Sequence, residues 1–201
     1  MTKEEKAAIR GMMIGDSYLR RKQKSYTTEL SIIHSQKQKD YFHYKRNFLE
    51  IALGKKINFS EYLNEGHPSI RLCVVHRYLN FCLKWLYKNH KKYISLRYLR
   101  KINNQGIAFW YMDDGSLYAK KTNGKTHAYE LVISMYASKE EALDAIKFMK
   151  ERLDIDFTLK YNKGKYSIRC GTHMAKKFLE QIDCYIPECM SYKTFRRTGD
   201  T

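Results

Sequence analysis

Residues 107–116 read IAFWYMDDGS, an apolar and aromatic run that ends in two aspartates and a glycine. A run of this kind, with no polar face, is typical of a buried helix. Residues 9–17 read IRGMMIGDS and end in the same way, with Asp16 in the place of Asp114. The two stretches predict two helices that are apolar on nearly all sides and buried, each of which delivers an aspartate at its end.

The two stretches belong to a longer internal repeat. Asp16 and Asp114 are 98 residues apart, and further matches follow at similar spacings. In chain order these are EL at residues 29–30 with EL at 130–131, which are 101 apart, and SIR at 69–71 with SIR at 167–169, which are 98 apart. Several matches in the same order indicate two structurally related units.

Each unit has the pattern helix, two strands, helix, two strands, helix. Residues 28–33 and 130–135, TELSII and ELVISM, are rich in β-branched side chains and are bounded by lysine-rich turns, as expected of strands. The middle helices, at 39–53 and 139–153, repeat apolar residues at helical spacing. Ser138, with a glutamate three residues later, predicts a capping box at the start of the second of these helices.

The fold class that follows is α+β, with two pseudo-symmetric αββαββα halves at residues 1–95 and 96–201 in one compact unit. The first helix of each half is expected to pack against its counterpart at the pseudo-dyad. Gly11 and Ala108 are small enough to allow a close approach there. The two motif aspartates would then emerge together at one end of the helix pair.

The charge of the chain indicates its partner. Lysine and arginine number 38 against 21 aspartates and glutamates, which gives a formal net charge of +17 spread along the whole length. A folded surface with this excess attracts polyanions, and nucleic acid is the polyanion we expect. The N-terminal residues lack the pattern of a secretory signal, and no apolar stretch reaches 18 residues. We therefore expect no membrane partner and an intracellular location, in an organelle or in bacterial or phage cytoplasm.

The paired aspartates suggest a metal site. An aspartate after an apolar helix is most often a cap or turn residue, but here the same acid ends the same helix twice. Two neighbouring carboxylates need compensation to stay charged, and a hard divalent cation such as Mg²⁺ supplies it. On a basic protein this combination is suited to hydrolysis of phosphodiester bonds.

The two motifs resemble those of the LAGLIDADG homing endonucleases, in particular the single-chain branch that carries two motifs. The resemblance covers nearly the whole chain. It implies saddle-shaped antiparallel β-sheets over double-stranded DNA, and a monomer that cuts both strands to leave short 3′ overhangs and so starts mobility of a host intron or intein. The cofactor it implies is Mg²⁺, as two or three ions, with Mn²⁺ as a substitute.

The resemblance also implies site residues. Asp16 and Asp114 are the candidate catalytic acids and metal ligands. The neighbouring Gly15 and Asp113 complete the candidate metal site, although Asp113 lies about 100° round the helix from Asp114 and is expected behind the ligands or in the turn. Two further candidate catalytic residues are lysines late in each half, Lys92 and Lys193, which follow the motif aspartates by 76 and 79 residues. A lysine there either stabilises charge at the scissile phosphate or is a solvated phosphate contact.

The motifs depart from the family pattern at Ser17, Phe109 and Trp110, so the two cleavage centres are expected to differ and one strand to be cut faster. Basic residues of the turns and strands are the candidate DNA contacts. They are Arg20, Arg21, Lys22, Lys24, Arg71, Lys120, Lys121, Lys125, Lys163, Lys165, Arg169, Arg196 and Arg197. Two alternatives stay open: an RNA-binding maturase on the same scaffold, with host intron RNA as partner, and a DNA-binding regulator without catalysis.

Overall fold

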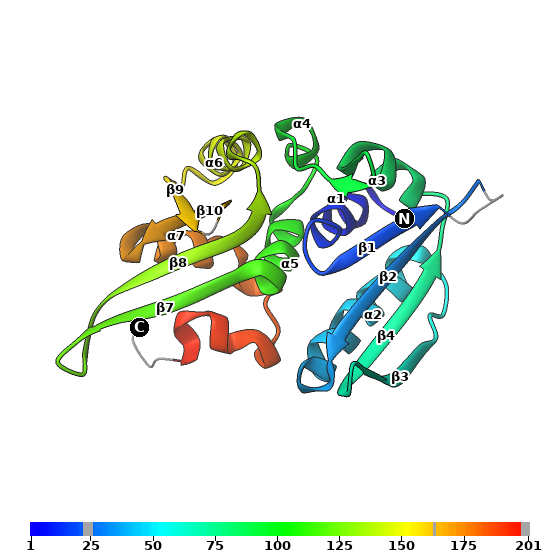
Figure 1. Cartoon of the computed structure of the whole chain (residues 1–201), viewed down its shortest axis with the longest axis horizontal. Helices are drawn as coiled ribbons and strands as arrows, with labels where there is room; N and C mark the ends of the chain where they lie inside the picture. Colours follow the sequence, from blue (N-terminus) through cyan, green and yellow to red (C-terminus); the bar gives the residue numbers. More distant parts are fainter. Residues whose placement is uncertain (22–25, 163, 198–201) are drawn as a thin grey trace.

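The computed structural model of the chain describes residues 1–21, 26–162 and 164–197. Lys22, Lys24 and Lys163, three of the expected DNA contacts, lie outside these ranges, and so does the side chain of Arg197. The elements form two similar halves that lie on either side of a central pair of helices (Figure 1). No helix among the described residues combines the length and apolarity needed to cross a bilayer.

The predicted order of elements occurs in both halves. The first half contains α1 (Lys3–Met12), β1 (Ser17–Arg21), β2 (Thr28–Ser35), α2 (Lys39–Leu53), β3 (Phe59–Asn64), β4 (His67–Val75) and α3 (Leu79–Leu86). The second contains α5 (Asn104–Asp114), β7 (Gly115–Thr122), β8 (Lys125–Ala137), α6 (Lys139–Leu153), β9 (Thr158–Asn162), β10 (Lys165–Gly171) and α7 (Thr172–Ile182). A short ladder, β5 (Tyr87–Lys88) with β6 (Lys91–Lys92), and α4 (Leu96–Leu99) join the halves. Four 3₁₀ turns, η1 (Gln36–Gln38), η2 (Asp183–Tyr185), η3 (Glu188–Lys193) and η4 (Phe195–Arg197), complete the described chain.

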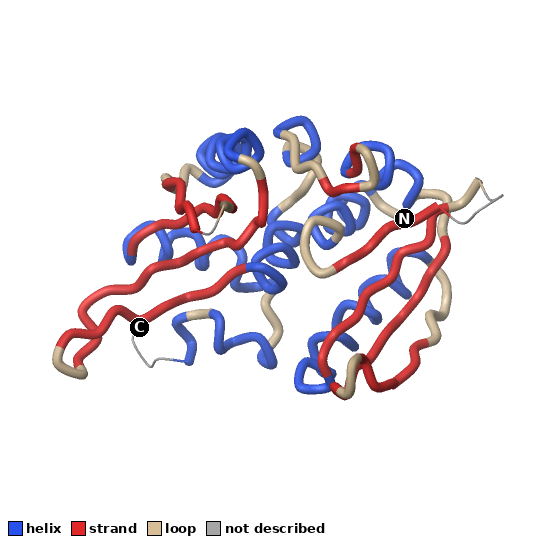
Figure 2. The backbone as a smooth tube through the Cα atoms, in the orientation of Figure 1, coloured by secondary structure: helices blue, strands red, loops and turns tan. Residues whose placement is uncertain are grey.

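Each half carries one antiparallel four-stranded sheet. The strand orders are β1-β2-β4-β3 and β7-β8-β10-β9, so the topology is the same in both. The long β7–β8 hairpin extends well beyond the rest of its half, as Figure 2 shows. The sheets fall on either side of the predicted boundary at residues 95 and 96, and the boundary itself stays a prediction.

The two motif helices, α1 and α5, pack against each other through glycine. A Cβ placed on Gly11 would lie 2.1 Å from the carbonyl oxygen of Gly106, a separation that real Cβ atoms do not reach. The expectation that Ala108 forms this contact was wrong, because residues 106 and 108 lie about 200° apart on a helix and cannot both face α1. The side chain of Phe109 packs against α2 of the first half, with its ring 5.1 Å from that of Phe48.

The two motif helices differ in burial. Every residue of α5 from Gly106 to Met112 is buried, as the apolar run predicted. In α1 the motif residues Ile9, Gly11 and Met12 are buried as predicted, whereas Lys3 and Glu4, in the first turn ahead of the motif, are exposed. At this exposed end a capping box satisfies the backbone amides of Thr2 and Glu5.

The predicted capping box at α6 is present and also anchors the join between the halves. The Ser138 hydroxyl accepts a hydrogen bond from the Glu141 amide at 3.3 Å, and the Glu141 carboxylate accepts one from the Ser138 amide at 2.9 Å. The other oxygen of the Glu141 carboxylate accepts from the buried Ile94 amide at 2.8 Å. One side chain thus starts the helix and fixes the connector.

The sheet register corrects one detail of the repeat. Arg71 pairs with Ile33 of β2, whereas Arg169 pairs with Val132 of β8. The second strands, β2 and β8, align at a spacing of 101 residues, since residues 32 and 133 pair with the equivalent positions 17 and 115. Ile33 then corresponds to Ser134, so the two arginines lie two residues apart along their strands. They still share a face, because side chains alternate along a strand.

Candidate metal centre and nucleic-acid interface

The site lies where the motif helices end. Asp114 is the last residue of α5, and Asp16 lies in the turn that links α1 to β1. This turn is tight, because the Ser17 amide donates a hydrogen bond to the Gly15 carbonyl at 2.7 Å. A Cβ on Gly15 would lie 2.2 Å from an Asp113 carboxylate oxygen, so glycine at this position allows the end of α5 to approach the turn.

Asp113 is the acid that reaches across to the first half. Its side chain is fully buried, and its Oδ1 lies 2.5 Å from the Nζ of the equally buried Lys45. The Tyr41 hydroxyl donates to the same oxygen at 2.8 Å. The other oxygen, Oδ2, accepts a hydrogen bond from the Asp16 amide at 2.9 Å. Three donors therefore satisfy Asp113, and one of them is the backbone of the first motif aspartate.

The electrostatics of the motif aspartates favour neutralisation. Asp16 is open to the groove described below, yet partial desolvation by the surrounding protein and then the nearby Asp113 carboxylate raise its pKa. Burial raises the pKa of Asp114 to about 7, with further contributions from Asp113 and Asp16. Acids with raised pKa values hold their negative charge poorly until a cation joins them.

The two candidate lysines occupy equivalent places at the helix ends. Lys92 Nζ donates to the Ile14 carbonyl at 2.9 Å and also to the Gly15 carbonyl. Lys193 Nζ donates to the Met112 carbonyl at 2.6 Å and to the Asp113 carbonyl at 3.3 Å.

The environment of these lysines lowers their basicity. Burial lowers the pKa of Lys92 to about 8, although the neighbouring aspartates oppose the shift. The pKa of Lys193 is also lowered by burial. Each motif helix therefore ends in one aspartate and one partly desolvated lysine.

The donors fit a hard divalent cation. Carboxylate oxygens are the ligands that such ions prefer, and Asp16 lies close enough to Asp114 to raise the pKa of that acid. The predicted Gly15 carbonyl is already occupied, because it accepts hydrogen bonds from the Ser17 amide and from the Lys92 ammonium. Asp16, Asp113 and His34 also each offer a ligand atom within 4.8 Å of one another. In that second group the Lys45 ammonium already contacts Asp113 and lies 3.2 Å from His34 Nε2.

A groove of about 680 Å³ leads from Asp16 along the first sheet. It is lined by Gly15, Asp16, Ser17, Tyr18, Arg20, Ser31, Ile33, His34, Ser35, Gln38 and Arg71. Arg20 is held by Glu29, with 2.7 Å between Arg20 Nη2 and the carboxylate, and Arg71 donates to the Ser31 hydroxyl at 3.1 Å. Two of the expected DNA contacts thus share one groove with the candidate metal centre.

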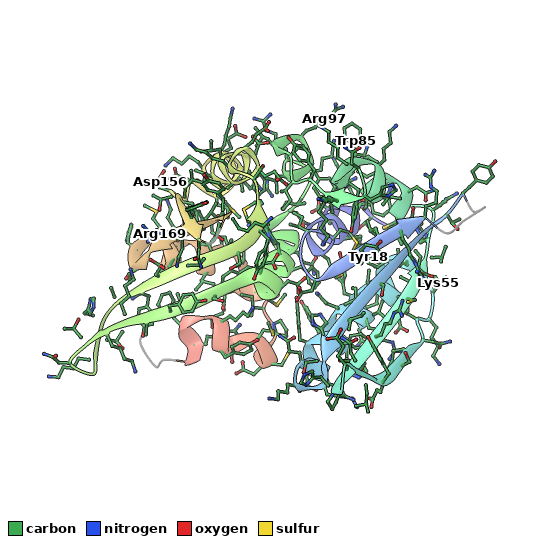
Figure 3. All side chains as sticks on the ribbon, viewed as in Figure 1. Tyr18, Lys55, Trp85, Arg97, Asp156 and Arg169 are labelled. Atoms are coloured by element: carbon green, nitrogen blue, oxygen red, sulfur yellow. The ribbon has the colours of Figure 1, made fainter. Side chains whose placement is uncertain are left out.

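In the second half, Glu130 forms ion pairs with three basic side chains of the sheet. Its carboxylate lies 3.0 Å from Lys120, 2.9 Å from Lys160 and 3.2 Å from Arg169. Hydrogen bonds from Lys160 and then from Lys120 lower its pKa to about 2. Figure 3 labels Arg169 on this half and Tyr18 on the other, on opposite sides of the central helices.

The remaining candidate contacts lie further out. Lys121 and Lys125 are exposed at the tip of the β7–β8 hairpin, and Arg21 and Lys165 are exposed at strand ends. Arg196 is paired with Asp183 at 3.1 Å and with Glu188 at 3.5 Å, so its guanidinium is held within the C-terminal segment. The DNA-binding roles of all these residues stay predictions.

Sequence reasoning missed Lys45, Tyr41 and His34. A signal for Lys45 was available, because this lysine falls on the apolar stripe of α2, four residues after Tyr41 and four before Leu49, all of them buried. A lysine in such a stripe indicates a buried acidic partner. The partner could not be identified from the sequence, since Asp113 lies 68 residues away.

Comparison with known proteins tests whether this combination, a motif helix that ends in an acid and recurs in two αββαββα halves, belongs to a known family. The model of the LAGLIDADG DNA endonuclease family matches residues 6–178. This chain belongs to that family.

Two curated relatives match the chain over different lengths. The probable intron-encoded endonuclease 1 of Wickerhamomyces canadensis is 31% identical over 110 residues, which are 53% of this chain and 46% of that protein. Protein RecA of Mycobacterium gastri is 26% identical over 206 aligned positions, which are 94% of this chain and 46% of that protein. The chain therefore spans about half the length of these relatives.

Solved LAGLIDADG structures share the fold. The homing endonuclease I-WcaI bound to its DNA recognition sequence superposes with a TM-score of 0.81 at 23% identity, over 96% of this chain and 86% of that one. The meganuclease I-AabMI bound to uncleaved DNA superposes with a TM-score of 0.60 at 10% identity, over 98% of this chain and 88% of that one. The predicted α+β fold with antiparallel sheets is confirmed.

Proposed function

We propose that this protein is a homing endonuclease that hydrolyses both strands of a long double-stranded DNA target with a divalent metal cofactor. The observation that carries the proposal is the end of the helix pair. Each motif helix supplies one aspartate with a raised pKa and one partly desolvated lysine, Asp16 with Lys92 and Asp114 with Lys193. Two such sets at one place suit a reaction that is carried out twice, once on each strand.

Asp16 and Asp114 would hold the metal ions. We name Mg²⁺ as the resident ion and Mn²⁺ as a substitute. The cation, when bound, polarises the scissile phosphate and lowers the pKa of water at the site. The charge of the two aspartates makes the site selective for cations in a protein whose overall charge is +17.

Lys92 and Lys193 act on the helix ends and on the phosphate. Each ammonium ties two backbone carbonyls beside a motif aspartate, which fixes the direction in which the carboxylate points. A desolvated positive charge at this position also stabilises the charge that develops on the phosphate oxygens during hydrolysis.

The DNA would lie across both sheets. Strands admit readout in the major groove, where base pairs are distinguishable. The groove that opens at Asp16 is lined by Arg20, Arg71 and the exposed Tyr18. On the second sheet, the basic side chains of Arg169 and Lys120 would contact the DNA. The projecting β7–β8 hairpin carries its lysines to phosphates further along the duplex.

The activity is tested with a deeply randomised duplex library. The purified protein is incubated with the library in Mg²⁺ or in EDTA, and the broken ends are sequenced. Discrete Mg²⁺-dependent breaks at one long motif, with short 3′ overhangs, are expected. Binding without breaks would contradict the proposal. It would leave the RNA-binding maturase and the non-cutting regulator as the readings to pursue, and retention of the host intron RNA would separate those two.

A further inference from the structure

A lysine is buried directly beneath the candidate metal centre. The side chains of Lys45 and Asp113 are both 0% exposed, and 2.5 Å separates their charged atoms. The pair crosses the molecule, because Lys45 belongs to α2 of the first half and Asp113 to α5 of the second. A buried pair of this kind adds little net stability compared with apolar residues, so its presence calls for another explanation.

The Lys45 ammonium occupies the place that a cation would take among Asp16, His34 and Asp113. It contacts Asp113 and lies 3.2 Å from Nε2 of His34. The other ring nitrogen of His34 is 3.2 Å from the Gln38 side-chain oxygen, an acceptor, which assigns the ring proton to Nδ1. Nε2 is then an acceptor that faces the ammonium. The group formed by Asp16, His34 and Asp113 therefore already contains a positive charge, the ammonium of Lys45 in α2.

The contacts of Asp113 link this cation to the first motif. Oδ1 is held by Lys45 and by the Tyr41 hydroxyl at 2.8 Å. With that oxygen fixed, Oδ2 accepts the Asp16 amide at 2.9 Å across a turn in which Gly15 leaves room for it. We propose that Lys45 is a positioning residue for Asp16: through Asp113 it fixes the backbone of the first motif aspartate and not that of the second.

The second half has no equivalent of this arrangement at the corresponding positions. The helices α2 and α6 align at a spacing of 100 residues, which places Ala145 opposite Lys45. The motif spacing of 98 places Gly15 opposite Asp113, and the strand spacing of 101 places Met135 opposite His34. None of these three side chains can make the ion pair. Loss of Lys45 should therefore affect the two cleavage centres unequally.

Two measurements test the inference, and the second of them rests on the proposed nuclease function. The variants are Lys45→Met, Asp113→Asn and the double variant with both changes. Lys45→Met alone leaves a buried carboxylate without its partner and is prone to unfold, whereas the double variant removes both charges. Leu49→Ala, a buried position one turn further along α2, is the matched control for general weakening of that helix.

The first measurement needs neither metal nor DNA. In the metal-free protein, the ¹⁵N-labelled Asp16 amide resonance is expected to move and its hydrogen exchange to accelerate in Lys45→Met, which keeps the Asp113 acceptor, and in the double variant, but not in Leu49→Ala. An Asp16 amide that stays unchanged in the double variant would overturn the inference. Because no cleavage is involved, this outcome is independent of whether the protein is a nuclease.

The second measurement follows the two strands of the target separately, each with its own label. In the double variant one strand is expected to slow about tenfold to a hundredfold more than the other, so that nicked duplex accumulates. Leu49→Ala should leave the ratio of the strand rates at the wild-type value. Equal slowing of both strands in the double variant would reduce Lys45 to a structural role and overturn the proposal. A wild-type protein that does not cut would contradict the proposed function alone.

Discussion

Gly11 and Gly106 meet backbone to backbone where α1 crosses α5, and a Cβ on Gly11 would lie 2.1 Å from the Gly106 carbonyl oxygen. A Cβ on Gly106 would in turn lie 2.9 Å from the carbonyl oxygen of Ala7. This crossing determines the distance between the C-terminal ends of the two helices. It therefore determines where the motif aspartates and their lysines lie with respect to each other.

Alanine at this crossing should destabilise the protein strongly. Gly11→Ala is expected to lower the free energy of unfolding by about 2–3 kcal/mol, because the nearest atoms are backbone and must shift apart. Urea unfolding measures the change. Gly171→Ala is the control, since a Cβ there meets nothing within 4 Å and the only cost, at a helix N-cap, is about 1 kcal/mol or less. Equal stability of the two variants would contradict the tight crossing.

The sequence was sufficient for the architecture because the architecture depends on local patterns. The apolar run before Asp114, the helical spacing in 139–153 and the capping box at Ser138 each determine an element from its own residues. The repeat then gave the arrangement of the halves. Glycine as the contact residue was predictable, but Gly106 was not, because the crossing point depends on the relative rotation of two helices.

The site was only partly predictable, for a different reason. Asp16 and Asp114 stand at the end of a repeated motif, and the lysines occupy equivalent places in the repeat. Asp113 was among the candidates, but Lys45 breaks the repeat, so comparing the halves could not reveal it. Their contact joins residues 68 positions apart in sequence, and such contacts are fixed by tertiary packing.

The pKa of Asp114 predicts that metal binding depends on pH. In the metal-free protein this pKa is raised to about 7, so near pH 7 about half of the molecules carry a proton that a cation must displace. Affinity should fall as the pH drops below 7 and level off as the pH rises above 8. Calorimetric titration with Mg²⁺ in two buffers of different ionisation enthalpy counts the released protons. Asp114→Asn should remove this release, and wild-type affinity that is constant between pH 6 and 8 would contradict the assignment.

Glu130 predicts a pH-dependent contribution to stability. Its folded-state pKa of about 2 lies below the ordinary value near 4.3, so its contribution is fully present above that value and is lost as the pH falls toward 2. Glu130→Gln should therefore be less stable than the wild type at pH 7. Urea unfolding at pH 7 and pH 3 should show the difference shrinking at the lower pH. A difference that stays constant would mean that the basic cluster does not depend on the carboxylate charge.

The affinity for DNA should depend steeply on salt. If about eight phosphates are neutralised, the logarithm of the affinity falls with the logarithm of the salt concentration at a slope near −7. Fluorescence anisotropy with a labelled duplex measures the slope. Alanine at both Lys121 and Lys125 should make the slope shallower by about 1–2, because these exposed lysines lie at the tip of the projecting hairpin. A wild-type slope shallower than about −3 would argue against contact along both sheets.

The central claim is that Asp16 and Asp114, one from each motif helix, both serve double-strand cleavage. The most direct measurement uses a supercoiled plasmid that carries one copy of the selected target, with Mg²⁺ or EDTA, and compares the wild type with Asp16→Asn and Asp114→Asn. The account predicts linear plasmid from the wild type in Mg²⁺ only, and none from either variant while both still bind the target. Linear plasmid at the wild-type rate from either variant would contradict it.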